Sequence, residues 1–197
     1  MPRPKRIAKG NLVYHVLNRA NGRLRIFKKP EDFLAFEQIL AEGADRFAMR
    51  VCGYCIMGTH WHLVLWPRAD GDLSAFMKWL TVTHSHRWHG AHRTVGMGHL
   101  YQGRYKSFPV QDGVYYLTLL KYVESNPLRA GLVHRSADWL WSSLAIRCGA
   151  ESPLTLSAGP VPLPRRWNRL VDGYADEPDE TLDTCLQRGR PFGEAQW

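Results

Sequence analysis

The sequence lacks an apolar run long enough to span a bilayer, and its first residues lack the apolar segment of a secretion signal. Cysteine is scarce, with four residues in a chain of 197, and no internal repeat is visible. These absences argue against a membrane helix, a disulfide scaffold and a repeat array, and they predict a cytoplasmic protein. With 45% hydrophobic residues, the chain is long enough for one main core.

Two of the cysteines, Cys52 and Cys55, have the spacing of a zinc or redox motif. In a strand, residues three apart face opposite sides of the sheet, and no second pair follows. We therefore interpret the cysteines as buried or incidental thiols.

Acidic residues are also in short supply, but only over part of the chain, whose formal net charge is +8. Residues 1–150 hold 21 lysines and arginines against 10 acidic residues, whereas residues 151–197 hold 5 against 8. The basic part predicts a polyanionic partner, although a solvated basic surface would give the same count. We divide the chain into a basic arm at 1–10, a catalytic domain at 11–148 and a proline-rich, acidic tail at 149–197.

Hydrophobic periodicity and turn residues predict the order strand, helix, strand, strand, helix, strand, helix. The predicted strands are 12–18, 50–57, one that starts at residue 60, and 101–110. The predicted helices are 30–47, 73–88 and a last one that is capped by Asp112 and stops near Asn126 and Pro127. This order is that of an α+β, ferredoxin-like fold, with an antiparallel sheet, helices on one face, a further C-terminal helix and an extended tail.

His60 and His62 flank Trp61 at the start of a buried strand. Alternate residues of a strand share a face, so the two imidazoles should lie side by side and could bind one divalent metal. The alternative is a pair of polar residues at a strand end.

Four more histidines, at positions 84, 86, 89 and 92, cluster at the end of the next predicted helix, with His84 on its inner face. They could ligate metal, which would make the chain a metal-binding protein of another kind. The flanking glycines instead favour a mobile loop that contacts solvent or phosphate.

Tyr122 and Asn126 lie four residues apart on the last predicted helix and therefore share a face. Tyr115 and Tyr116 have leucines at the corresponding position. This singles out Tyr122 as a candidate reacting group beside a metal ligand. The alternative is a core tyrosine followed by a helix stop.

The predicted strand 101–110 places Arg104 and Lys106 on one face among aromatic residues. Cations interleaved with aromatics are typical of proteins that hold single-stranded nucleic acid. An edge strand with solvated side chains is the other interpretation, because Pro109 favours an edge.

Three segments, His60–His62, Gly103–Lys106 and Tyr122–Val133, resemble the single-tyrosine transposases that carry a histidine-hydrophobic-histidine motif. Among these, the chain is most similar to the REP-associated tyrosine transposases. The resemblance covers about residues 5–148, and the Tyr-x-x-x-Asn-Pro-x-Arg-Ala-Gly block is its most specific part. The segment 188–193 is similar to tails in part of that family.

The resemblance implies a DNA endonuclease and strand-transferase. His60, His62 and Asn126 would hold magnesium or manganese, and Tyr122 would attack a DNA phosphodiester to leave a 5′-phosphotyrosine and a free 3′-hydroxyl. Many relatives use glutamine as the third ligand, but asparagine also occurs in the REP-associated group.

The implied substrate is single-stranded DNA beside an imperfect palindromic hairpin, bound by a monomer or a homodimer. The candidate DNA contacts are Arg3, Arg6, Arg19, Arg104, Lys106, Lys121 and Arg129. An alternative function is a regulator descended from a transposase that binds hairpin DNA or RNA without cutting it.

Overall fold

The computed structural model describes residues 8–176 and 179–197. Arg3, Arg6 and most of the predicted basic arm lie outside the described residues.

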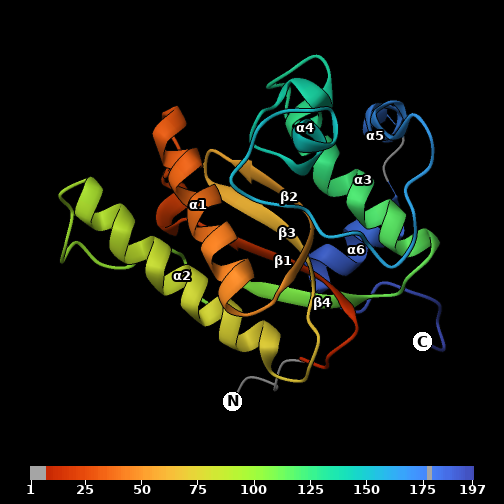
Figure 1. Cartoon of the computed structure of the whole chain (residues 1–197), viewed down its shortest axis with the longest axis horizontal. Helices are drawn as coiled ribbons and strands as arrows, with labels where there is room; N and C mark the ends of the chain where they lie inside the picture. The colour runs from red at the N-terminus through yellow and green to blue at the C-terminus, as the bar shows by residue number, and fades with distance from the viewer. Residues whose placement is uncertain (1–7, 177–178) are drawn as a thin grey trace.

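A four-stranded antiparallel sheet forms the centre of the fold (Figure 1). The spatial order is β2-β3-β1-β4, with strands β1 Val13–Arg19, β2 Arg50–Met57, β3 His60–Trp66 and β4 Lys106–Val110. The β-α-β-β-α-β order confirms the predicted α+β, ferredoxin-like class.

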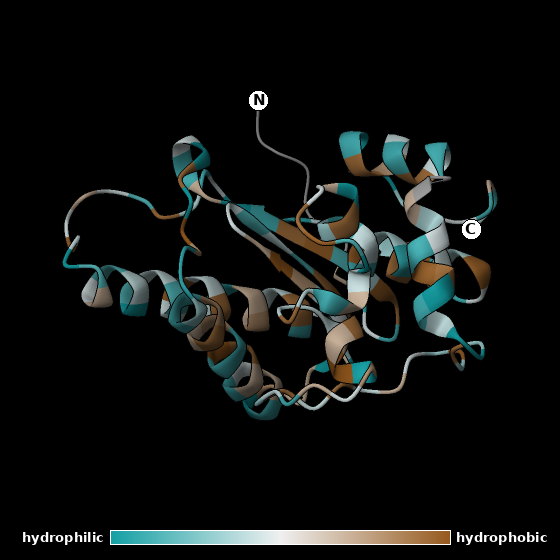
Figure 2. Cartoon of the chain, turned by 90° about the horizontal axis from the view of Figure 1, so that it is seen from above, coloured by the Kyte–Doolittle hydropathy of each residue, from teal (hydrophilic) through white to brown (hydrophobic). Residues whose placement is uncertain are grey.

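Helices cover both faces of this sheet (Figure 1). Helices α1 Pro30–Arg46 and α2 Asp72–Ala91 pack on one face, as predicted, and α3 Val114–Arg129 packs on the other. Alternation along β2 explains the two cores, since Tyr54 and Ile56 face α1 and α2 while Cys55 and Met57 face α3. In Figure 2 apolar stretches of the strands lie between these helices.

A bulge in β2 overturns the prediction that Cys52 and Cys55 face opposite sides. The register with β3 shifts between Val51 and Gly53. The extra residue turns Cys52 toward α3, so both cysteines lie in the same cluster. All four cysteines are free thiols, and Cys148 is exposed.

The last strand is shorter than predicted. β4 starts at Lys106, and the predicted residues before it contribute only an isolated bridge between Ala20 and Tyr101. Arg104 therefore lies in the connection that precedes the strand.

Helix α3 differs from its prediction at both ends. Gly113, with φ of 69°, is its N-cap in place of Asp112, and the helix continues through Pro127 to Arg129. Proline lacks the N–H that would bond to the carbonyl of Val123. The side-chain amide of Asn126 lies 3.5 Å from this carbonyl oxygen, so the helix carries Pro127 without a break.

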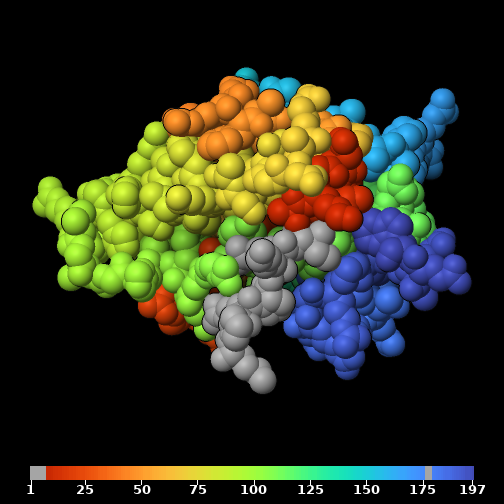
Figure 3. All heavy atoms as spheres, turned by 90° about the horizontal axis from the view of Figure 1, so that it is seen from below, coloured from red at the N-terminus to blue at the C-terminus, as the bar shows by residue number. Residues whose placement is uncertain are grey.

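The C-terminal tail is folded rather than extended. It contains α5 Trp167–Asp176 and α6 Glu180–Arg188, and it follows α4 Ser143–Arg147 and two short 3₁₀ turns, η1 Asn21–Arg23 and η2 Ser136–Asp138. The blue segments in Figure 3 lie against the body of the molecule. None of the described helices is long and apolar enough to cross a membrane.

Later segments also bond to both outer strands of the sheet. The N–H of Phe192 donates to the carbonyl of Pro109 on β4, and the N–H of Ile56 on β2 donates to the carbonyl of Trp141.

We expect Gly53→Ala to reduce the free energy of unfolding by about 1–3 kcal/mol. A Cβ at Gly53 would overlap the end of the Leu120 side chain, which would have to change its packing in a closely packed core. Urea unfolding measures the change. The control is Gly90→Ala in α2, where the new Cβ has nothing within 4 Å and the helix should gain about 0.5–1 kcal/mol. Equal effects at the two glycines would contradict this interpretation.

Candidate active site and nucleic-acid grooves

His60 and His62 lie side by side at the start of β3, with ring centroids 5.1 Å apart. His62 is only 4% exposed, and His60 is partly buried. In the sheet register His62 lies opposite Leu17 of β1 and Cys55 of β2, so the pair belongs to the face that α3 covers.

Both imidazoles are neutral at physiological pH. Burial, together with the nearby Arg19 guanidinium, lowers the pKa of His60 to about 4. Burial also places the pKa of His62 well below its usual value, with His15 and His60 as the next contributors. The neutral ring is the form that binds a metal.

A third histidine, His15, lies beneath this pair and was missed in the sequence. Its Nε2 atom lies 2.9 Å from Nδ1 of His62, and the two rings are stacked with centroids 5.2 Å apart. Burial lowers the pKa of His15 to about 3. The available signal was a histidine inside the apolar strand Val13–Leu17.

Tyr122 of α3 contacts two of the histidines. Its ring meets the ring of His62 edge-on at 5.7 Å and that of His15 at 6.2 Å. Asn126 lies one turn later, with its Nδ2 donating to the Tyr122 carbonyl at 2.8 Å, so its Oδ1 is free to accept. Arg129 places its guanidinium 5.0 Å from the centre of the Tyr122 ring.

Neighbouring groups shift the pKa of the Tyr122 phenol in opposite directions. Burial raises its pKa, and Asp183 of α6 adds to this increase. Arg129 and the side chain of Asn126 lower the pKa, because they favour the phenolate.

The donor set fits a divalent ion. His60 uses Nδ1 for a 3.0 Å contact with the Thr59 hydroxyl, and His62 uses Nδ1 for His15, so Nε2 remains on each ring. Within residues 8–176 and 179–197, no three histidine, cysteine or acidic side chains could hold a metal together. The amide oxygen of Asn126 remains the predicted third donor.

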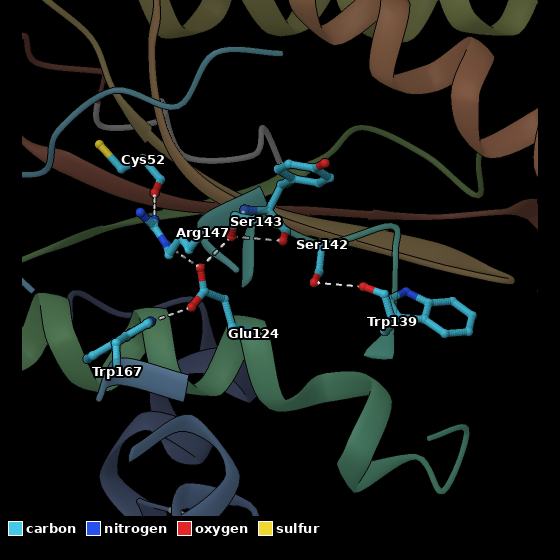
Figure 4. A network of polar contacts seen from close by, with 8 residues as sticks. Cys52, Glu124, Trp139, Ser142, Ser143, Arg147 and Trp167 are labelled. Carbon is cyan, nitrogen blue, oxygen red and sulfur yellow. Dashed lines mark hydrogen bonds and ion pairs between the residues drawn. The ribbon is translucent and has the colours of Figure 1, made fainter. Parts of the chain in front are cut away.

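A buried carboxylate between Tyr122 and Asn126 fixes α3 in place (Figure 4). Glu124 Oε1 accepts hydrogen bonds from Ser143 Oγ at 2.5 Å and Arg147 Nε at 2.9 Å. Its Oε2 accepts from Trp167 Nε1 at 2.6 Å. Arg147 also donates to the carbonyl of Cys52. This network, which sequence reasoning missed, ties α3 to β2, α4 and α5.

One groove of about 590 Å³ opens beside the end of β1, and we call it the β1 groove. Its cations are Arg19, Arg104, Lys106 and Arg188, and none of its described lining residues is acidic. Lys106 and His62 are the two neighbours of Leu17 across the sheet, so the groove and the histidines share a face about 10 Å apart. Arg188 was not among the predicted contacts, although the tail motif contains it.

A second groove, the α2 groove, of about 1090 Å³, lies between α2 and residues 98–105. It shares Asn18 and residues 102–105 with the β1 groove, and the lining that the structure describes contains no acidic residue. Lys78 and Arg104 supply its fixed positive charge.

The other candidate contacts lie apart from these grooves. Lys121 places its ammonium 5.4 Å from the ring centre of Tyr174 in the tail, and Arg129 lies over Tyr122.

The second histidine cluster is dispersed. His84 is buried rather than in contact with solvent or phosphate, and its Nδ1 is hydrogen-bonded to the Tyr101 hydroxyl at 2.6 Å. His92 stacks on Trp88 and lies 3.2 Å from Asp32, and His89 contacts Thr94. α2 extends to residue 91, so these side chains point in different directions from a helix.

Comparison with known proteins gives a consistent family match. The family described as "Transposase IS200 like" matches residues 8–126. A solved structure of a REP-associated tyrosine transposase bound to a REP hairpin aligns with a TM-score of 0.61 and 17% identity, over 83% of this chain and 99% of that chain, which shows a shared fold. A putative transposase from Deinococcus radiodurans R1 aligns with a TM-score of 0.45 and 20% identity, over 64% and 97%. None of the curated proteins matches.

We expect Glu124→Gln to reduce the free energy of unfolding by about 3 kcal/mol, because the partly buried Arg147 loses its countercharge and one donor loses its acceptor. Chemical denaturation measures the loss. Glu42→Gln is the control, since the Glu42–Arg87 pair is about half exposed and should contribute less than about 1 kcal/mol. If Glu124→Gln lowers the free energy of unfolding no more than Glu42→Gln does, the network does not stabilise the fold as inferred.

Stability should also fall below pH 6.5 because of His84. Burial lowers its folded pKa to about 3, so only the unfolded chain binds the proton between pH 6.5 and 3. The loss should be about 1.4 kcal/mol per pH unit for this residue. Urea unfolding of the native chain and of His84→Gln at pH 6.5 and 5 isolates the contribution of His84. The free energy of unfolding should fall less with decreasing pH in the variant. The exposed His86→Gln should keep the native slope.

Proposed function

Because the chain belongs to the IS200-like transposase family, we propose that it nicks and rejoins single-stranded DNA through Tyr122. The observation that supports this most strongly is the packing of the Tyr122 ring on His62, with Asn126 one turn further along the same helix. The candidate nucleophile thus lies against one of the two neutral imidazoles of its own chain, and the amide of Asn126 lies on the same helix.

The Tyr122 oxygen would attack the scissile phosphorus and form a phosphotyrosine bond. The bond from phosphorus to the 3′ oxygen breaks, the phenol gives up its proton and the leaving 3′ oxygen takes one up. Another strand's 3′-hydroxyl can reverse the step, so strand transfer needs no external energy source. Arg129 favours the phenolate that attacks.

His60, His62 and Asn126 would hold a magnesium or manganese ion. When bound, such an ion polarises the scissile phosphate and offsets the charge that develops on it.

The β1 groove supplies a path for the DNA backbone to this site. Its four cations can neutralise phosphates along a single strand, and Arg104 continues the positive charge into the α2 groove. We propose Arg19, Arg104, Lys106 and Arg188 as backbone contacts. The REP hairpin in the structural neighbour suggests a hairpin with single-stranded flanks as the substrate.

The same geometry favours a monomer as the catalytic unit. Tyr122 reaches the histidines of its own chain, so no residue from a second copy is needed to complete the set.

The test is cleavage of labelled single-stranded DNA hairpins with manganese or with chelator. We expect metal-dependent nicking and a covalent protein–DNA adduct in the native chain. Tyr122→Phe should reduce both by at least about a thousandfold, because the attacking oxygen is lost. Tyr115→Phe is the matched control on the same helix, and it should nick like the native chain, since Tyr115 packs on Phe192.

Two other outcomes would contradict the proposal. Nicking that survives in Tyr122→Phe would exclude this nucleophile. Binding without cleavage by the native chain across a panel of hairpins would favour a regulator that holds hairpin nucleic acid.

A further inference from the structure

His15 makes one polar contact, and that contact is with a proposed metal ligand. The residue lies at the centre of β1, opposite Val64 and Phe108, with no exposed surface. Its Nε2 lies 2.9 Å from Nδ1 of His62. Its own Nδ1 is buried without a hydrogen-bond partner in the described part of the chain.

A histidine is a costly choice at this position. Its ring also packs against two aromatic rings, Phe108 at 5.1 Å and Tyr122 at 6.2 Å. A buried nitrogen without a partner is unfavourable, whereas an apolar ring would pack here without that cost. The polar contact with His62 therefore indicates a role other than stabilising the fold.

The chemistry of the imidazole defines that role. A neutral ring has one nitrogen that donates and one that accepts. Nδ1 of His62 faces His15, so only Nε2 of His62 can bind a ligand. Binding through Nε2 requires the proton of His62 to be on Nδ1, and Nε2 of His15 is the acceptor that this proton needs.

We infer that His15 is a positioning residue: its Nε2 accepts a hydrogen bond from Nδ1 of His62, fixes the orientation of that ring and keeps its Nε2 available to the divalent ion. The inference rests on the proposed function. His15 itself does not touch the ion, because its one bonded nitrogen is directed at His62.

The first experiment is a calorimetric titration of the full chain with Mn²⁺ in the absence of DNA. We expect His15→Phe to bind Mn²⁺ about 10–100-fold more weakly than the native chain. We expect His15→Gln, whose amide can reach Nδ1 of His62, to stay within about threefold of native. The midpoint of thermal unfolding should be about unchanged in His15→Phe, because the substitution removes the unpartnered Nδ1 of His15 but leaves Nδ1 of His62 without its partner. A purely structural role would instead lower stability and affinity together.

Two further variants keep the test decisive. His15→Asn repeats it with a polar side chain too short to reach His62, and it should bind Mn²⁺ as weakly as His15→Phe. His84→Phe replaces a buried histidine in the other core, and it should keep native affinity. Equal losses in the His84 and His15 variants would overturn the inference.

Failure of the inference and failure of the proposed function are distinguishable. If the native chain nicks DNA and His15→Phe binds Mn²⁺ like the native chain, only the role of His15 is wrong. If the native chain binds no Mn²⁺ and does not nick, the proposed function fails and the role of His15 fails with it.

Discussion

A carboxylate with no exposed surface needs hydrogen-bond donors on its oxygens, and Glu124 obtains them from the part of the chain that follows its own helix. Ser143, Arg147 and Trp167 provide the donors. The family match ends at residue 126, so the segment that holds α3 in place lies beyond the matched region. The placement of Tyr122 over the histidines therefore depends on the packing of α4 and α5, and the tail is part of the structure that supports the site.

Local patterns were sufficient to predict the centre of the fold. β2 was predicted with its observed bounds and α1 to within one residue at its end, because each has a periodicity that packing on a sheet does not override. Tyr122 and Asn126 were singled out by their spacing, and in the structure the ring of Tyr122 contacts the ring of His62. The transposase resemblance is confirmed by the family match.

Features that depend on distant parts of the chain could not be predicted. β4 is short because residues 101–105 bond to the end of β1 instead of continuing a strand. The two helices of the tail form against α3 and the sheet, and a composition rich in proline and acidic residues concealed them. His15 and Glu124 looked like ordinary polar residues. Their partners are 47 and at least 19 positions away, a separation that only the folded chain resolves.

Phe192 bonds to β4 and Trp141 bonds to β2, so both edges of the sheet are partly covered by later segments of the chain. An outer strand with free N–H and C=O groups is a template to which another chain can add a strand. Here the protein's own later residues already occupy backbone groups of both outer strands, at Pro109 and at Ile56. An invading peptide or a second copy would have to displace these segments before it could extend the sheet there. The segments that contain Trp141 and Phe192 thus hinder strand exchange and edge-to-edge aggregation at these points.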